Sequence, residues 1–407
     1  NTIAQQKPFI NIAKIHSDAY VQQSSAAGER YPEVNEAIKD NIALGSLVVN
    51  YFGHGGEDGL SGERIFEKGD SQELTNECRL PLFITITCEY TRFDNPLRET
   101  AGEFMYWNEN GGAVALLTTT RQIFQNVGVS INELLARYLF SYGSNEYQPV
   151  SEALRQTKTL VTTSNKRTVF YIGDPALKLA IPRPRVNLTA INDVPITQPT
   201  DTLKALSKVK MAGNITDEFG NLLDTYNGTV FSTIYDKKIQ RQTLANDFPF
   251  VLDFETLGEI IFRGKSEVVD GNFEFEFVVP RDITIPVGNG RISFYAEKGD
   301  VLEDHTGFNE SFRVGELDEN APVDNDPPVV NLFLNDESFV SGGITNESPF
   351  LLAKLSDDNG INTASGIGHD IVAILDGDEV NPFVLNDYYE TEPVSYTHLT
   401  LPTTPYV

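Results

Sequence analysis

Two short apolar segments each lead into a side chain capable of nucleophilic or acid–base chemistry. Residues 47–52 precede His54 in SLVVNYFGHGGEDG, and residues 83–87 precede Cys88 in LPLFITITCEYTRFDNP. Both segments are rich in β-branched and aromatic residues and are apolar on both faces, which is typical of strands buried in a parallel sheet. The carboxyl ends of such strands lie at the edge where α/β active sites open. The sequence therefore predicts that His54 and Cys88 meet there.

The pairing of a histidine with a cysteine predicts nucleophilic catalysis of the cysteine-peptidase type. A thiol with an ordinary pKa of about 8.5 is weakly ionised at neutral pH, and a neighbouring imidazole takes its proton or stabilises the thiolate. Glycines flank the histidine, and we expect the N–H groups of Gly55 and Cys88 to hold an oxyanion. The alternative makes His54 a core histidine and Cys88 a small buried apolar residue. Two occurrences of strand, glycine turn and reactive residue favour catalysis.

Longer strings around these residues resemble the gingipain family of cysteine peptidases. They are NYFGHGGEDGLSGERIF, TCEYTRFDNPLRETAGEFMYWNENGGAVALLTTTR and FYIGDPALKLAIP. The upstream strings KIHSDAY and GERYPEVNEAI extend the resemblance to the sortases of the type IX secretion system, over about residues 8–182. The resemblance implies a caspase-like α/β fold, a parallel sheet flanked by helices, with a catalytic dyad of His54 and Cys88. It implies no required cofactor.

The same resemblance implies a sortase at the bacterial cell surface or outer membrane. Such an enzyme removes the C-terminal signal domain of secreted cargo and transfers the acyl group to a surface acceptor, here anionic lipopolysaccharide. Its other partners are the remaining type IX secretion components, and its signal peptide is expected to be missing from this sequence, which begins at Asn1. Two alternatives stay open: a general secreted endopeptidase of the gingipain kind, and a non-catalytic surface binding module.

Polar residues beyond the strand ends are candidates for substrate contacts. One lies close to the histidine, one lies in the loop after the cysteine, and three end the strand predicted at 113–120. A polar strand exit and a solvated loop are the alternative interpretations of these positions. The set comprises Glu57, Asp94, Thr119, Thr120 and Arg121.

In gingipains an acidic residue on an earlier strand orients the histidine. Asp18, which follows the apolar run 9–15, is the candidate for that role in this sequence. An aspartate at a strand end is also a common turn former, which is the alternative interpretation.

Charge, hydropathy and cysteine usage exclude some classes of partner. The 407-residue chain has 58 acidic and 31 basic residues, which gives a net charge of −27. A basic surface for nucleic acid is therefore not expected, and neither is adsorption to anionic membranes. No apolar run reaches the ~18 residues that a transmembrane helix needs. Because Cys88 is the predicted nucleophile, Cys78 is expected to be a free buried thiol.

Residues 1–182 are predicted to be the C-terminal part of a caspase-like peptidase domain, truncated at its N-terminus. Besides the strands ending at His54 and Cys88, apolar runs predict strands at 8–15 and 113–120. Helices are predicted at 31–43, 100–110, 131–142 and 150–159. Alternation of this kind indicates a parallel sheet covered by helices on both faces.

The character of the chain changes after residue 182. Short alternating runs separated by Gly, Asn and Asp predict an antiparallel, immunoglobulin-like β-sandwich over 183–318. Residues 319–393 are predicted to be a linker and a partial further β domain. The uncharged string 394–407 resembles translated sequencing-adapter read-through, and we expect it to be a non-native artefact.

Acidic residues near the second boundary are candidates for ligands of a structural calcium ion. They match no complete ligand pattern, so a solvated acidic linker is the favoured interpretation. The set comprises Asp318, Asp324, Asp326, Asp357 and Asp358.

Overall fold

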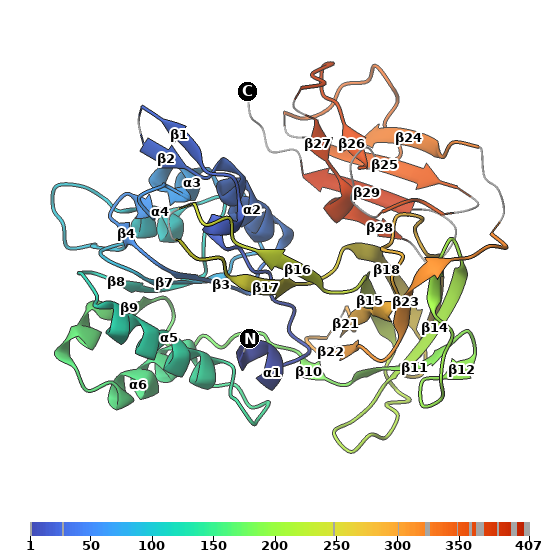
Figure 1. Ribbon diagram of the computed structural model, residues 1–407, viewed down its shortest axis with the longest axis horizontal. Helices are drawn as coiled ribbons and strands as arrows, with labels where there is room; N and C mark the ends of the chain where they lie inside the picture. Colours follow the sequence, from blue (N-terminus) through green and yellow to red (C-terminus); the bar gives the residue numbers. More distant parts are fainter. Residues whose placement is uncertain are drawn as a thin grey trace. The chain divides into compact units, whose positions relative to one another are not determined.

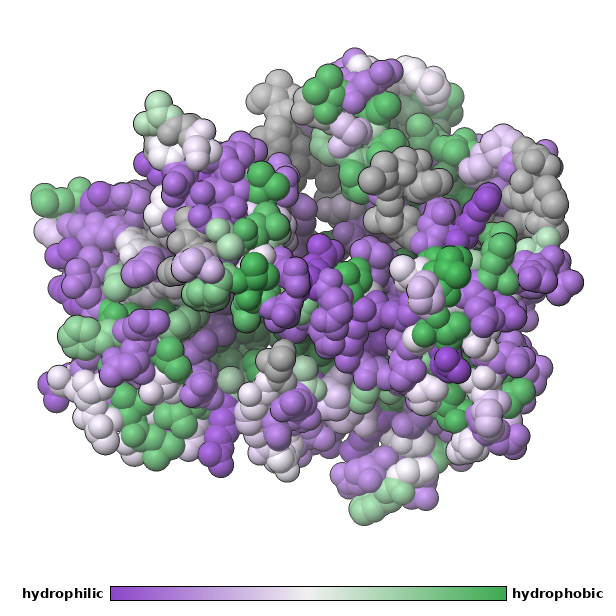
Figure 2. Space-filling view, viewed as in Figure 1, coloured by the Kyte–Doolittle hydropathy of each residue, from purple (hydrophilic) through white to green (hydrophobic). Residues whose placement is uncertain are grey.

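The protein divides into two compact units (Figure 1). The computed structural model describes residues 2–26, 28–246, 249–299, 301–321, 326–347, 349–357, 360–363, 370–380, 382–391 and 397–402. Unit 1 comprises Asn1–Ile181 with Gln240–Phe254, and unit 2 comprises Pro182–Ile239 with Glu255–Val407. Hydrophilic residues cover most of the visible face in Figure 2, in keeping with the net charge of −27. Within the described ranges, no helix has the length and apolar character needed to cross a bilayer.

A four-stranded sheet in the order β3-β7-β8-β9 forms the centre of unit 1. Its strands are β3 (Val48–Phe52), β7 (Leu82–Ile86), β8 (Ala115–Thr119) and β9 (Val169–Ile172). The pairs β3–β7 and β7–β8 are parallel, and β8–β9 is antiparallel. The chain enters β9 beside the end of β8, where Val169 pairs with Thr119, so β9 must run backwards. The sheet is therefore mixed, and the prediction of a wholly parallel sheet is wrong.

Helices lie on both faces of this sheet (Figure 1). One face carries α5 (Gln125–Leu139) and α6 (Val150–Leu160), and the other carries α2 (Pro32–Leu44), α3 (Lys68–Glu73) and α4 (Ala101–Trp107). α2 begins at a proline and ends at Gly45, whose φ of 103° is left-handed. α4 begins with a capping box formed by Thr100 and Glu103. The four predicted helices are confirmed, although α5 begins at Gln125 and not at 131.

The strand predicted at 8–15 is wrong. These residues form an irregular segment between α1 (Thr2–Gln6) and the 3₁₀ turn η1 (Ser17–Ala19). Phe9 is buried, and Ile15 packs against the core cluster that contains Tyr31 and Phe83. Phe9 and Ile15 therefore pack against the rest of the unit without the ladder of hydrogen bonds that a strand requires.

Unit 1 also contains short antiparallel pairings that the sequence patterns do not indicate. A hairpin joins β1 (Gln23–Ser25) to β2 (Gly28–Arg30), and a three-stranded sheet joins β4 (Gly55–Gly56), β5 (Gly59–Leu60) and β6 (Phe66–Glu67). A further hairpin pairs β16 (Ile239–Gln242) with β17 (Asp253–Thr256). A second 3₁₀ turn, η2 (Ser164–Thr168), precedes β9.

Two of the β-sheets in unit 2 share one core through their inward side chains. The smaller sheet has the order β12-β11-β14-β19, and the larger has the order β10-β22-β21-β15-β18-β28-β29-β25-β24. Alternate residues of β14 are buried, and the core joins residues of β11, β14 and β19 to residues of β15, β18 and β21. This arrangement is a sandwich of largely antiparallel strands, in keeping with the period-2 pattern, but the larger sheet contains the parallel pairs β10–β22 and β18–β28. The immunoglobulin-like assignment stays a prediction.

The remaining bounds in unit 2 complete the description. The first twelve strands are β10 (Arg183–Pro184), β11 (Val186–Ile191), β12 (Val194–Pro195), β13 (Leu203–Ala205), β14 (Lys208–Ile215), β15 (Gly228–Tyr235), β18 (Ile260–Val268), β19 (Asn272–Val278), β20 (Gly288–Asn289), β21 (Arg291–Glu297), β22 (Asp304–Asn309) and β23 (Arg313–Leu317). The later elements are β24 (Val329–Leu334), β25 (Phe350–Ser356), β26 (Val372–Ala373), β27 (Phe383–Val384), η3 (Asn386–Tyr388), β28 (Tyr389–Thr391) and β29 (Thr397–Pro402). β29 pairs with β25 and β28. The artefact predicted at 394–407 stays a prediction, and residues 394–396 and 403–407 lie outside the described residues.

Candidate active site

Strand register brings the two predicted catalytic residues to equivalent positions. β3 and β7 are adjacent and parallel, and their last residues, Phe52 and Ile86, are paired. His54 and Cys88 each follow two residues later, so both leave the same edge of the sheet from neighbouring strands. The side chain of His54 is exposed, and Cys88 is half-buried.

Hydrogen bonds to the backbone fix the turn that carries His54. The carbonyl oxygen of His54 accepts from the Tyr51 hydroxyl at 2.6 Å and from the Ser61 N–H at 2.8 Å. One residue earlier, the Gly53 carbonyl accepts from Thr87 Oγ1 at 2.7 Å. The histidine turn is therefore held both by its own strand and by the residue that precedes Cys88.

Gly55 permits the close approach of these two strand ends. A Cβ at this position would lie 2.7 Å from Thr87 Oγ1 and 2.8 Å from Thr87 Cγ2, which is closer than real Cβ contacts. A residue with a side chain would therefore separate the histidine turn from the end of β7. Glycine is needed here for packing, whether or not its N–H also holds an oxyanion.

The backbone turns sharply directly after Cys88. Glu89 has a φ of 53°, in the left-handed region that non-glycine residues rarely adopt. The Glu89 N–H donates to the Arg121 carbonyl at 3.5 Å, and Cys88 Sγ lies 3.9 Å from the carbonyl oxygen of Ile123. The segment that follows β8 therefore borders the thiol.

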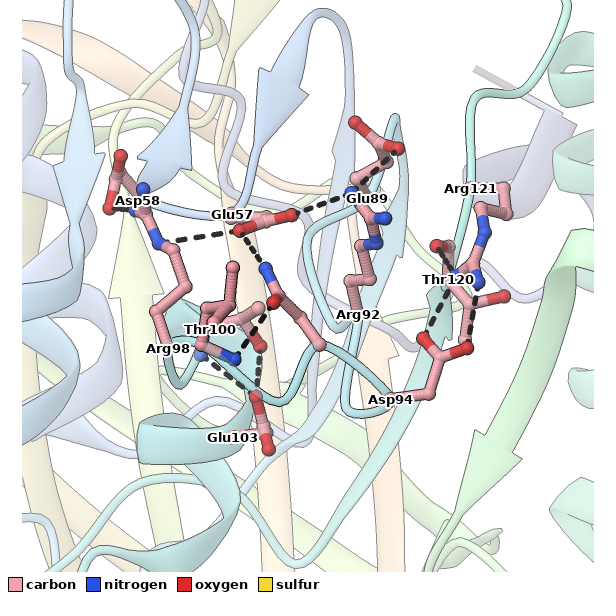
Figure 3. Close-up of polar contacts among 12 residues, drawn as sticks. Glu57, Asp58, Glu89, Arg92, Asp94, Arg98, Thr100, Glu103, Thr120 and Arg121 are labelled. Carbon is pink, nitrogen blue, oxygen red and sulfur yellow. Dashed lines mark hydrogen bonds and ion pairs between the residues drawn. The ribbon is translucent and has the colours of Figure 1, made fainter.

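The loop after Cys88 is tied to the histidine turn through Glu57 (Figure 3). The Glu57 carboxylate accepts from Arg92 Nη1 at 3.0 Å and from Asn95 Nδ2 at 2.9 Å, and it lies 3.3 Å from Arg98 Nε. Arg98 also pairs with Asp58, the next residue. These contacts connect residues 92–98 with residues 57–58.

On the other side, the same loop is tied to the end of β8 by one ion pair (Figure 3). Asp94 accepts two hydrogen bonds from the Arg121 guanidinium, at 2.8 and 2.7 Å. The guanidinium lowers the pKa of the Asp94 carboxyl, and the carboxylate raises the pKa of Arg121. Both side chains are nearly half exposed, so solvent screens their interaction.

The other predicted substrate residues differ in accessibility. Thr119 is fully buried, and its hydroxyl donates to the Thr87 carbonyl, so it supports the end of β7. Thr120 is half-buried, and its N–H donates to the Thr168 carbonyl at 3.0 Å. Among the described residues, no acceptor contacts the Cys88 N–H. An N–H that is to donate to an oxyanion must have no other acceptor, so this observation is compatible with the predicted role. The substrate and oxyanion roles themselves stay predictions.

The Asp18 carboxylate is engaged away from the histidine. It accepts from the backbone N–H groups of Asn246 at 2.7 Å and Ala245 at 3.2 Å, in the loop between β16 and β17. The side chain of His54 has no hydrogen-bond or ion-pair partner within the part of the chain that the structure describes. Asp18 therefore fits the alternative interpretation of a loop-capping aspartate.

The prediction that Cys78 is buried is wrong. Cys78 is a free cysteine, as expected, but it is exposed and its φ is 65°. It lies in the turn between α3 and β7, where the chain has left the core. The two thiols of the protein are therefore both accessible to a small reagent.

Metal ligation has little support in the described residues. They contain no group of three or more His, Cys, Asp or Glu side chains suited to a metal ion. Two members of the predicted calcium set, Asp324 and Asp358, lie outside the described residues. A structural calcium ion in the β-rich region stays a prediction.

Sequence reasoning missed the residues that organise the site around the dyad. Arg92, Asn95 and Arg98 lie in the string TRFDNPLRE, and their spacing in a loop gives no signal that they share an acceptor. Tyr51 and Thr87 carry no signal either, because aromatic and β-branched residues are ordinary components of strands. Their roles become visible only when β3 and β7 are paired.

Comparison with known proteins gives one family match and several similar solved structures. Residues 1–180 match the family model described as peptidase family C25. A sequence search of the curated proteins gives no match. Among solved structures, dimeric latent PorU from Porphyromonas gingivalis is 29% identical, with a TM-score of 0.38 and coverage of 70% of this chain and 28% of that one.

A second solved structure is the Arg-specific cysteine proteinase gingipain R (RgpB). It is 17% identical, with a TM-score of 0.31, and the match covers 69% of this chain and 56% of that one. The chain thus spans little more than a quarter of the PorU chain and about half of the gingipain chain. With the match over the whole of the sheet and both strand ends, residues 1–180 are similar to peptidase family C25.

Proposed function

We propose that this protein is a cysteine endopeptidase in which Cys88 is the nucleophile and His54 the proton-transfer partner. The observation that carries the proposal is the equivalent position of the two residues beyond the paired ends of β3 and β7. The left-handed backbone of Glu89, directly after the thiol, adds support. Such backbone costs about 1–3 kcal/mol and tends to persist at functional sites. A sharp turn beside a nucleophile exposes it to substrate.

The first chemical step forms a thioester. Cys88 gives its proton to His54, its sulfur bonds to the carbonyl carbon of a peptide, and the resulting oxyanion is held by the N–H groups of Gly55 and Cys88. The C–N bond then breaks. The leaving amine takes the proton from the imidazolium, so charge and protons balance, and the acyl group stays on the sulfur.

The second step distinguishes hydrolysis from transfer. Water would release a free carboxylate, whereas an amine acceptor would form a new amide. The resemblance of residues 8–182 to the type IX secretion sortases favours transfer, with secreted cargo as the acyl donor and anionic lipopolysaccharide as the acceptor. The proposed location is the bacterial surface, together with other components of that secretion system.

We place the substrate rim along the segment after β8. Thr120 and Arg121 follow the strand next to the nucleophile strand, and Asp94 is held there by Arg121. Ile123 touches the thiol through its carbonyl oxygen. A peptide entering from this side would pass these groups before reaching Cys88.

The test uses a cargo protein with its C-terminal signal domain, a small amine acceptor and intact-mass analysis of the products. The expected result is a single cut at the signal junction with the mass of the acceptor added, and loss of both in Cys88→Ala. Many cuts without an adduct would instead establish a general endopeptidase. Products that do not depend on Cys88 would refute the catalytic proposal and favour the surface-module alternative.

A further inference from the structure

The Glu57 carboxylate is the most highly connected acidic group beside the dyad. It accepts hydrogen bonds from Arg92 and Asn95 and forms an ion pair with Arg98, and all three residues lie in the loop that follows Cys88. Its backbone carbonyl also accepts from the N–H of Ala101, the first residue of α4, at 2.8 Å. One residue therefore holds both the loop and the helix after it.

Burial makes these contacts stronger than ordinary surface ion pairs. The Glu57 side chain is 15% exposed, whereas its neighbour Asp58 is 71% exposed. A shielded carboxylate with charged donors makes shorter and stronger hydrogen bonds than neutral groups do. Removing it would take the shared acceptor from Arg92, Asn95 and Arg98 and would leave the two guanidinium groups only their contacts with Glu89 and Asp58.

A continuous path of contacts runs from Glu57 to the nucleophile. Arg92 bonds to Glu57 at 3.0 Å and lies 3.7 Å from the carboxylate of Glu89. Glu89 is the residue with left-handed backbone that directly follows Cys88. At its other end, Glu57 lies three residues after His54, on the turn held by Tyr51 and Ser61.

We propose that Glu57 is a positioning residue, which keeps Cys88 and His54 in register by clamping the nucleophile loop to the histidine turn. This inference rests on the proposed function of the dyad. It replaces the expected role of Glu57 in substrate binding, because its two oxygens are already occupied by three side chains of the protein. Its effect reaches the reacting atoms through Arg92 and Glu89.

The test measures how readily Cys88 is alkylated at different pH values. Iodoacetamide is added to a Cys78→Ser protein, since Cys78 is exposed and would also react, and the modified fraction is followed by mass spectrometry. A thiol paired with histidine reacts well below the ordinary pKa of about 8.5. In Glu57→Gln we expect the inflection in the plot of the Cys88 alkylation rate against pH to rise by about one pH unit. The alkylation rate at acidic pH then falls about tenfold.

Asp58→Asn is the matched control. Asp58 is the adjacent acidic residue and shares the Arg98 contact, but its side chain is exposed and it has no contact with Arg92 or Asn95. Its variant is expected to keep the inflection of the background protein. Loss of fold stability alone would lower the melting temperature without moving the inflection of the folded protein.

A second variant keeps the test independent of whether Glu57→Gln folds. Asn95→Asp has nearly the same shape but replaces the donor at 2.9 Å with a repelling carboxylate, so it should raise the inflection in the same direction. An unchanged inflection in a folded Glu57→Gln, or in Asn95→Asp if the former does not fold, would overturn the positioning role. If the background Cys88 itself titrates as an ordinary thiol, the proposed dyad is wrong instead.

Discussion

The loop after Cys88 is attached to its surroundings at two points, which differ in burial and in the number of contacts. On the histidine side, one shielded carboxylate gathers three donors from the loop. On the β8 side, Asp94 and Arg121 form a single, well-aligned pair that stands nearly half exposed in solvent. The first attachment depends on burial, and the second on geometry alone.

This difference separates a fixed side of the loop from an adaptable one. A shielded network loses several interactions at once when it opens, whereas an exposed ion pair exchanges its partners for water at little cost. The fixed side lies next to the turn of His54, the proposed proton-transfer partner, whose alignment the proposed mechanism requires. The adaptable side faces the proposed substrate rim, where charged groups can rearrange as a peptide enters.

The largest expected effect comes from deleting the fixed attachment. Glu57→Ala removes the acceptor that Arg92, Asn95 and Arg98 share, while Arg98 keeps its pair with Asp58 and Arg92 its contact with Glu89, and we expect a loss of about 2 kcal/mol in the free energy of unfolding. Urea denaturation followed by tryptophan and tyrosine fluorescence measures this value. Asp58→Ala should leave the midpoint unchanged, and equal losses in the two variants would refute the distinction between buried and exposed contacts.

A smaller effect is expected from the bond that holds the histidine turn. Tyr51→Phe removes the hydroxyl that donates to the His54 carbonyl at 2.6 Å, at a cost of about 1 kcal/mol. Burial raises the pKa of Tyr51, so its phenol remains a donor through the neutral and mildly alkaline range. Peptide turnover should fall while substrate KM stays constant. A rise in KM at constant kcat would instead place Tyr51 in substrate binding.

The adaptable attachment is probed by Arg121→Met. Because this ion pair is exposed, we expect only a small decrease in the urea midpoint. The Michaelis constant for a peptide substrate should rise by about fivefold at most, with kcat retained, since the change removes one exposed contact at the rim. A large loss of stability would show that the pair is structural and that the comparison between the two sides fails.

The smallest expected effect is a pH dependence of the same pair. The Arg121 guanidinium lowers the pKa of Asp94, so the pair contributes stability above the ordinary carboxyl pKa, and this contribution is lost as pH falls through the lowered value. The stability difference between the protein and Asp94→Asn should therefore be constant from pH 7 to about pH 5 and should shrink below about pH 4. Its growth on acidification would contradict the assigned direction.

The strands and the placement of the two candidate residues beyond their ends could be predicted from the sequence. Residues 48–52 and 82–86 are rich in β-branched and aromatic residues, and the reactive residues follow at equal spacing. β7 is buried throughout, as expected, whereas β3 lies at the edge of the sheet and is half-buried or exposed. The helices could be predicted as well, because their apolar residues recur every three or four positions. These inferences need only local pattern.

Features that depend on pairing could not be predicted in this way. The antiparallel direction of β9 follows from where the chain re-enters the sheet, and the irregular segment 8–15 has an apolar content that also fits a strand. Glu57 looked like a loop residue because its three donors lie 35 to 41 positions away, at 92, 95 and 98. Asp18 has partners more than 200 positions away.

The contact between Asp18 and Asn246 affects how unit 1 can fold. The bond from the Asn246 N–H to Asp18 spans 228 positions, and the hairpin that supplies it, Gln240–Phe254, groups with residues 1–181. Closing so long a loop costs conformational entropy, and this cost slows folding. The entropic cost grows only logarithmically with loop length. During synthesis the unit is therefore incomplete until residue 254 has emerged from the ribosome. A fragment that ends at residue 182 would lack the hairpin Gln240–Phe254, which belongs to the same unit.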